Sequence, residues 1–179
     1  QPVYPHPRVK EIMNFIRTNK FFSFIIDKKY GGSQLSVKDL SAVAISEGPG
    51  SYTGLRIGVS AAKGICIALN IPLISIDTMQ NLARKIQVSE GLIIPAMDAR
   101  RDEIYFSIFQ PDESGIPIKV SKTDCLVLNK DSFSIYFQSS FVNFVGNCNE
   151  KIKKFLHHEN IIFSDYILPS ANEMGLLSF

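Results

Sequence analysis

Gly48-Pro-Gly-Ser-Tyr-Thr-Gly54 lies between two apolar segments, residues 42–46 before it and residues 55–69 after it. This order predicts a strand, a tight glycine loop and a helix, because glycine adopts the positive φ angles that sharp turns need. Ser51 or Thr53 is expected to cap the helix. The free N–H groups and the dipole at the helix start form a candidate anion site. Two interpretations therefore remain open, a phosphate-binding loop and a turn that only positions the helix.

The composition is that of a globular protein, with 45% hydrophobic and 20% charged residues among 179. A net charge of +2 with scattered lysines does not predict a strongly basic RNA-binding surface, so we expect any RNA contact to be shared with a partner. The three distant cysteines predict neither a zinc site nor a disulfide framework. No apolar run reaches the roughly 18 residues of a membrane span. The first residues lack a signal-peptide layout, and we expect a cytoplasmic protein without membrane contact.

Two predicted helices, residues 19–30 and 53–69, have apolar side chains on more than one side. A surface helix usually has a single apolar stripe. Small residues also recur along the second helix at three- and four-residue spacing, which allows another helix to pack closely. Burial within the chain and contact with a partner both explain this pattern.

The rest of the chain alternates between predicted strands and helices, which is typical of an α/β protein. The predicted strands are residues 72–76, 92–97, 104–109, 119–120, 125–128, 142–145 and 161–163, and the predicted helices are 78–86, 149–155 and one that begins after Ser170. Residues 133–137 fit either type. We place the boundary between an N-terminal lobe, residues 1–88, and a C-terminal lobe, residues 89–179, near the turn at 88–91.

The glycine loop does not match the motifs of catalytic glycine loops. A Walker P-loop continues with Lys and Ser or Thr after its last glycine, whereas Leu55 follows Gly54 here. The spacings G-x-G-x-x-G and G-x-S-x-G of dinucleotide loops and nucleophile elbows are also missing. The candidate loop site comprises Gly48, Pro49, Gly50, Ser51, Tyr52 and Arg56. Arg56 is expected either to bind an anion or to cap a carbonyl group.

A charged turn lies between the predicted strands 92–97 and 104–109. It contains Asp98, Arg100, Arg101 and Glu103, which could form an acid/base cluster or a hairpin turn with surface ion pairs. The histidines do not have the H-E-x-x-H spacing, so no metal site is predicted. Catalytic chemistry is therefore not visible in the residues alone.

Ser46-Glu-Gly-Pro-Gly-Ser-Tyr-Thr-Gly-Leu-Arg-Ile-Gly-Val-Ser-Ala-Ala-Lys-Gly64 strongly resembles the signature of the TsaB (YeaZ) family. The match continues at residues 36–45, 71–82 and 95–105, and a thinner match continues to the end. The resemblance implies an α/β, two-lobed fold with mixed sheets, of the actin/Hsp70-like (ASKHA, ribonuclease H-like) type. It implies a role in making threonylcarbamoyladenosine (t6A) at position 37 of tRNAs that read ANN codons.

The same resemblance implies a non-catalytic partner subunit rather than an enzyme on its own. The implied partners are the related catalytic subunit TsaD, the ATPase TsaE, tRNA through the complex, and a second copy of the chain in isolation. Family members pair through their first two helices, which match residues 19–30 and 53–69. The predicted interface comprises Phe21, Phe22, Ile25, Thr53, Gly54, Ile57, Gly58, Ala61, Ala62 and Ile65. In a two-lobed fold, the charged hairpin is expected between the lobes.

The sequence departs from the family pattern at both ends. Residues 1–18 do not match the family's first strand-turn, and the last predicted helix is unfinished, so the chain looks shortened. We expect no tightly bound cofactor, with ATP or ADP at the interface of the complex. The alternative is an independent ATP-binding enzyme of this superfamily, such as a small-molecule kinase, with residues 146–149 as a phosphate loop. A protease would need a nucleophile–base or metal pair that the residues do not supply.

Overall fold

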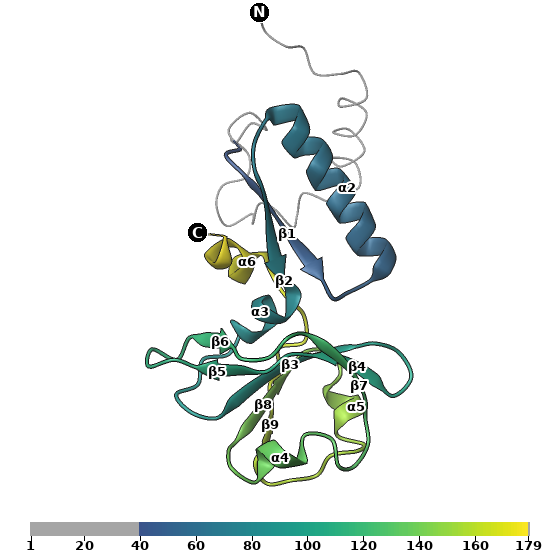
Figure 1. Cartoon of the computed structure of the whole chain (residues 1–179), viewed down its shortest axis with the longest axis vertical. Coiled ribbons are helices and arrows are strands. Elements are labelled where there is room, and N and C mark those ends of the chain that lie inside the picture. Colours follow the sequence, from purple (N-terminus) through teal and green to yellow (C-terminus); the bar gives the residue numbers. More distant parts are fainter. Residues whose placement is uncertain (1–39, 179) are drawn as a thin grey trace, which may run out of the picture. The chain divides into compact units, whose positions relative to one another are not determined.

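A computed structural model describes residues 40–178 of the chain (Figure 1). The chain divides into two compact units, and the described parts of the first are residues 40–76 and 170–178. The second unit is Asp77–Pro169. The predicted lobes differ from these units in two places, because residues 77–88 join the second unit and the last residues join the first. The predicted helix 19–30, with Phe21, Phe22 and Ile25, lies outside the described residues.

The first unit is built on strand β1 (Val43–Gly48) and helix α2 (Tyr52–Leu69), as the pattern around the glycine loop predicts. β1 pairs with β2 (Leu73–Asp77), and α6 (Ala171–Leu177) contacts β1. The core of the unit contains Val43, Ala62, Ile65 and Cys66, which are all buried. Apolar residues from one side of α2 therefore close over the strands.

Capping residues account for both ends of α2. The Oγ of Ser51 accepts a hydrogen bond from the backbone N–H of Gly54 at 3.2 Å, which satisfies one of the free donors of the first turn. At the other end, Asn70 adopts a left-handed conformation with φ 54°, and its N–H donates to the carbonyl of Cys66. Asparagine tolerates this conformation better than most residues, so the helix ends there.

Among the described residues, the second unit has a seven-stranded mixed sheet. Its strands are β3 (Leu92–Asp98), β4 (Glu103–Phe106), β5 (Phe109–Pro111), β6 (Pro117–Lys119), β7 (Asp124–Val127), β8 (Val142–Val145) and β9 (Ile161–Phe163). The order β6-β5-β3-β4-β7 is antiparallel, whereas β8 runs parallel to both β3 and β9. The carboxyl ends of three neighbouring parallel strands, β3, β8 and β9, therefore meet at one edge.

Apolar side chains bury both faces of this sheet. Ile93 points to a cluster with Met79 and Leu82 of helix α3 (Thr78–Ala83). The next residue, Ile94, points to the opposite cluster, which includes Phe144. Helices α4 (Ser134–Phe137) and α5 (Asn149–Ile152) contribute to this second cluster. Strands with both faces covered read as continuous apolar runs, as β3 does from Leu92 to Met97.

Several predicted elements differ in detail. The helix expected at residues 149–155 ends at Ile152, and the strand expected at 119–120 is Pro117–Lys119. The helix expected at residues 78–86 ends at Ala83. Its N-terminal cap is the side chain of Asp77, whose Oδ1 accepts a hydrogen bond from the N–H of Met79 at 2.7 Å. The strand expected at 104–109 is divided between β4 and β5. Ser170 precedes α6, but its side chain makes no capping bond to the helix backbone. Across residues 40–178, no helix combines the length and the apolar character that a membrane crossing requires.

Candidate functional site

The glycine loop packs its backbone against Leu55, the first large apolar residue of α2. Gly48 has φ 114°, and a Cβ at this position would lie 3.2 Å from Cδ1 of Leu55. A Cβ on Gly50 would also contact Leu55, at 3.6 Å. The glycines therefore allow the loop to lie close to the start of its own helix.

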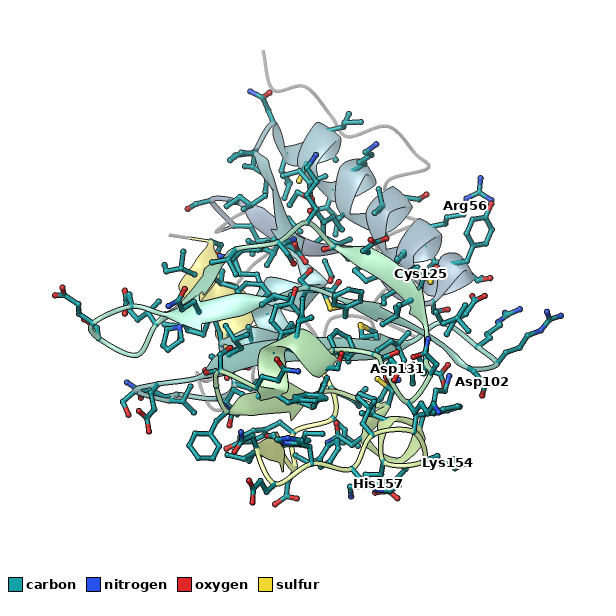
Figure 2. All side chains as sticks on the ribbon, turned by 60° about the horizontal axis from the view of Figure 1, so that its bottom comes forward. Arg56, Asp102, Cys125, Asp131, Lys154 and His157 are labelled. Atoms are coloured by element: carbon teal, nitrogen blue, oxygen red, sulfur yellow. The ribbon has the colours of Figure 1, made fainter. Side chains whose placement is uncertain are left out.

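Arg56 contacts an aromatic ring rather than a helix carbonyl. Its guanidinium carbon lies 4.8 Å from the centre of the Tyr52 ring, within the range of a cation–π contact. Both side chains are exposed, and Figure 2 shows Arg56 directed away from the ribbon. Anion binding by Arg56 stays a prediction.

The structure corrects the predicted face of α2. Ala62 and Ile65 are only 5% and 3% exposed, because they pack into the core beneath the helix. A Cβ on Gly58 would meet Cδ1 of Ile45 at 3.4 Å, so Gly58 also faces β1. These three residues serve packing within the chain. Ala61 is half-buried at the edge of the same core.

The outer side of α2 carries a stripe with heptad-like spacing. Thr53, Ile57, Ser60, Gly64 and Ile67 follow one another at intervals of four, three, four and three residues, which places them along one side of a helix. Ile57 is 43% exposed and Ile67 is 82% exposed. Gly64 is half-buried, and Thr53 and Ser60 are exposed. We call these five residues the α2 stripe.

Only Thr53 and Ile57 of the α2 stripe were among the predicted interface residues. The helix has apolar or small residues on nearly every side, so its composition does not identify the side that faces the strands. The heptad spacing that starts at Thr53 is the signal that would have added Ser60, Gly64 and Ile67. Gly54, also predicted, is exposed, and a Cβ there would lie 3.3 Å from Oγ of the capping Ser51.

The predicted charged hairpin is formed by β3 and β4. Oδ1 of Asp98 accepts hydrogen bonds from the N–H of Arg100 and from Nζ of Lys151, both at 2.6 Å. The bond from Lys151 is the main reason that the pKa of Asp98 lies below its ordinary value. Lys151 also donates to the carbonyl of Glu103 at 3.1 Å. The hairpin is thus a charged turn whose first carboxylate is neutralised by α5.

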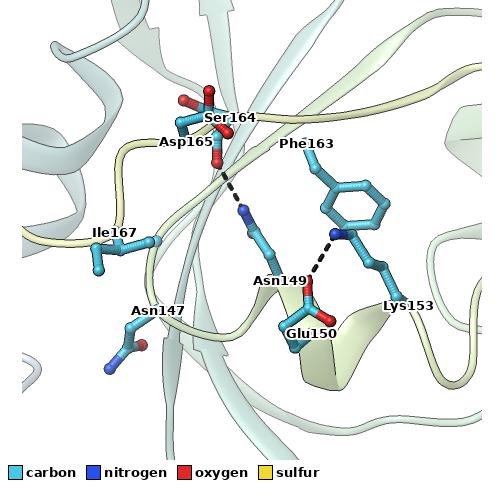
Figure 3. A pocket seen from close by; sticks show the side chains of 9 residues that line it. Asn147, Asn149, Glu150, Lys153, Phe163, Ser164, Asp165 and Ile167 are labelled. Carbon is cyan, nitrogen blue, oxygen red and sulfur yellow. Dashed lines mark hydrogen bonds and ion pairs between the residues drawn. The ribbon is translucent and has the colours of Figure 1, made fainter.

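A hollow of about 240 Å³ lies where β8 and β9 end (Figure 3). Its lining is Gly146, Asn147, Asn149, Glu150, Lys153, Phe163, Ser164, Asp165 and Ile167. Nδ2 of Asn149 donates to the carbonyl of Ser164 at 2.7 Å, and its buried Oδ1 has no hydrogen-bond partner among the described residues. Lys153 forms an ion pair with Glu150 at 2.7 Å and lies 5.1 Å from the centre of the Phe163 ring. This hollow includes the loop 146–149 that the sequence offered as a phosphate loop.

The cysteines are not activated as nucleophiles. Burial raises the pKa of the Cys148 thiol to about 12 and also raises that of Cys66. Cys125 is exposed, but desolvation and the nearby Glu103 and Asp124 carboxylates raise its pKa too. Within residues 40–178, no group of three or more His, Cys, Asp or Glu side chains is placed to hold a metal ion.

Comparison with known proteins identifies relatives of the chain. The family model described as "TsaD: tRNA N6-adenosine threonylcarbamoyltransferase" matches residues 22–123, more than half of the chain. The tRNA threonylcarbamoyladenosine biosynthesis protein TsaB of Bacillus subtilis is 41% identical over 76 residues, which are 42% of this chain and 33% of that protein. The Escherichia coli TsaB is 37% identical over 86 residues, 47% of this chain and 37% of that protein. The match thus spans about a third of the length of these two relatives.

A solved structure shares the fold. It is an uncharacterized Pseudomonas aeruginosa protein "with similarity to peptidase YEAZ", with a TM-score of 0.69 and 20% identity. The similarity covers 84% of this chain and 69% of that chain. The mixed sheet and the family match agree with the actin/Hsp70-like fold that the glycine-loop signature implied. The chain belongs to the family that the TsaD model describes and, within it, to the TsaB (YeaZ) proteins.

Proposed function

We propose that this chain is a non-catalytic partner subunit in the formation of threonylcarbamoyladenosine at position 37 of ANN-reading tRNAs. It binds a TsaD-like catalytic subunit through the α2 stripe and activates it. A TsaE-like ATPase joins the complex, tRNA reaches the chain through the complex, and the chain pairs with a second copy when alone. The assembly works in the cytoplasm.

The exposed apolar residues of α2 carry this proposal. Ile57 and Ile67 are exposed on a helix whose opposite side already forms the core of the unit. Small residues, Ser60 and Gly64, lie between them, and small residues at such spacing let a second helix approach closely. Water-exposed isoleucines gain free energy when another surface covers them, at roughly 25 cal/mol per Å² of apolar area buried.

The charged and ionisable groups of the second unit favour a binding role for the chain over a catalytic one. Lys151 neutralises Asp98, and the cysteine thiols keep their protons near neutral pH. We therefore propose that the chain binds no cofactor tightly and that ATP or ADP is held at the interface of the complex. The charged hairpin is proposed to supply surface contacts.

Reconstitution tests the proposal. The full chain, a TsaD-type relative and a TsaE-type ATPase from the same genome are combined with an unmodified ANN-reading tRNA, ATP and a threonylcarbamoyl donor. The modified nucleoside is measured by mass spectrometry. We expect the product to depend on this chain. The double variant Ile57→Arg/Ile67→Arg should lower the rate at least tenfold, because two charges would be buried in an apolar contact.

Ile135→Arg is the matched control, since Ile135 is 69% exposed on α4 of the second unit. The control should retain the wild-type rate. A rate that does not depend on this chain would contradict the proposal, and so would equal losses in the control and the α2 double variant. Gly58→Arg is a poor choice for this test, because Gly58 faces Ile45 in the core.

A further inference from the structure

The tip of the β3–β4 hairpin has an unusual backbone. Arg100 and Arg101 have φ angles of 77° and 43°, so two successive residues with long side chains adopt the left-handed conformation. Turns of this kind usually contain glycine, asparagine or aspartate, because a side chain is strained there. Such strain persists where neighbouring contacts enforce it, and it is often found at functional sites.

The surrounding structure holds this tip in place. Oδ1 of Asp98 accepts from the N–H of Arg100, and the N–H of Glu103 donates to the carbonyl of Arg100 at 2.9 Å. From the segment after β8, Lys151 bonds to Asp98 and to the carbonyl of Glu103. Oδ1 of Asn147 accepts from the N–H of Asp98 at 3.0 Å. The conformation is therefore fixed from both strands and from α5.

Within residues 40–178, the two arginine side chains are exposed and form no ion pair, so they are accessible to a ligand. Asp98 forms an ion pair with Lys151, so the Asp98 carboxylate is not available to pair with the two arginines. Asp102, also at the tip, is exposed (Figure 2). A guanidinium group presents five N–H donors in a planar fork that suits phosphate oxygens.

We propose that Arg100 and Arg101 contact the phosphodiester backbone of RNA, with the hairpin and Lys151 positioning them. This inference rests on the proposed function, in which the RNA is a tRNA. A long polyanion can be contacted by an exposed hairpin tip as it passes over it. Two contacts give little affinity alone, which agrees with the nearly balanced charge of the whole chain and with an RNA contact shared with a partner.

Binding of a fluorescently labelled unmodified tRNA tests the proposal. Anisotropy titrations use the full chain, alone and with the TsaD-type relative, between about 50 and 200 mM salt. We expect Arg100→Asn/Arg101→Gly to weaken binding about tenfold at low salt. It should also reduce the magnitude of the negative slope of log K against log salt by roughly 1.5, since two phosphate contacts are lost. The thermal midpoint should hold or rise, because the substituted residues favour the left-handed turn.

Two further variants make the result specific. Lys122→Gln/Lys130→Gln removes the same charge from exposed positions elsewhere in this unit and should leave the affinity and slope unchanged. Arg100→Lys/Arg101→Lys keeps the charges and should retain most of the salt slope. Unchanged tRNA binding by Arg100→Asn/Arg101→Gly, or an equal loss in the lysine control, would overturn the proposal. Because the chain is also titrated alone, this failure is distinguishable from a failure to assemble with the relative.

Discussion

Gly146 shows how tightly one residue is constrained where β8 ends. Its φ is 134°, and a Cβ there would lie 2.0 Å from the carbonyl oxygen of Ala96. Ala96 lies on β3, which runs parallel to β8 beside it. Only glycine lets the chain leave β8 at this point.

Gly146→Ala is therefore expected to destabilise the second unit by about 3 kcal/mol, through backbone strain and the steric clash with Ala96. Chemical denaturation of the full chain measures the change. Gly175→Ala is the control, because a Cβ at Gly175 on α6 meets nothing within 4 Å. The control should be neutral or stabilising by up to about 1 kcal/mol. Equal stability of the two variants would refute the described geometry around Gly146.

Cys148 couples the stability of the second unit to alkaline pH. Burial raises the pKa of its thiol from the ordinary 9.0 to about 12, so the folded state keeps the proton that the unfolded state loses. Its contribution to stability is complete below pH 9.0 and is lost as the pH rises towards 12. Denaturation midpoints from pH 8 upward should fall less steeply for Cys148→Ala than for the wild type. Parallel pH profiles would show that the thiol is not shielded.

At the scale of elements, α2 has two sides that should respond differently to substitution. Ile65→Ala opens a space in the core and should cost about 2–4 kcal/mol. Ile67→Ala removes an exposed side chain and should change stability by less than about 0.5 kcal/mol. Urea denaturation of the two variants compares the same substitution two residues apart. A larger loss of stability for Ile67→Ala than for Ile65→Ala would show that the buried and exposed sides of the helix are assigned wrongly.

The strength of the sequence signal differed between elements for physical reasons. β8 and β9 have the predicted bounds. β9 is a short apolar run between Asn160 and Ser164, and β8 ends just before Gly146. α3 ends early, at Ala83, where no glycine or proline marks the end. The left-handed Arg100 and Arg101 could not be predicted, because turn preferences favour glycine and asparagine there. In α2, the helix was predictable, but its buried side depends on packing against β1 and β2, which local pattern does not reveal.

At the scale of the whole molecule, the described chain consists of two separately packed units with one apolar helix side left exposed. The family signature identified the fold and the family. The candidate interface was predicted only in part, since three of its residues, Gly58, Ala62 and Ile65, pack against the chain's own strands. Assembly with a partner is what distinguishes a scaffold subunit from an enzyme that acts alone.

The size of the complex between the full chain and the TsaD-type relative tests the proposed partner role most directly. Light scattering coupled to gel filtration should show the two proteins in one species. Ile57→Arg/Ile67→Arg should separate them, and Ile135→Arg should not. Elution of the wild-type proteins at their separate masses, or an intact complex with the α2 double variant, would contradict docking through the α2 stripe.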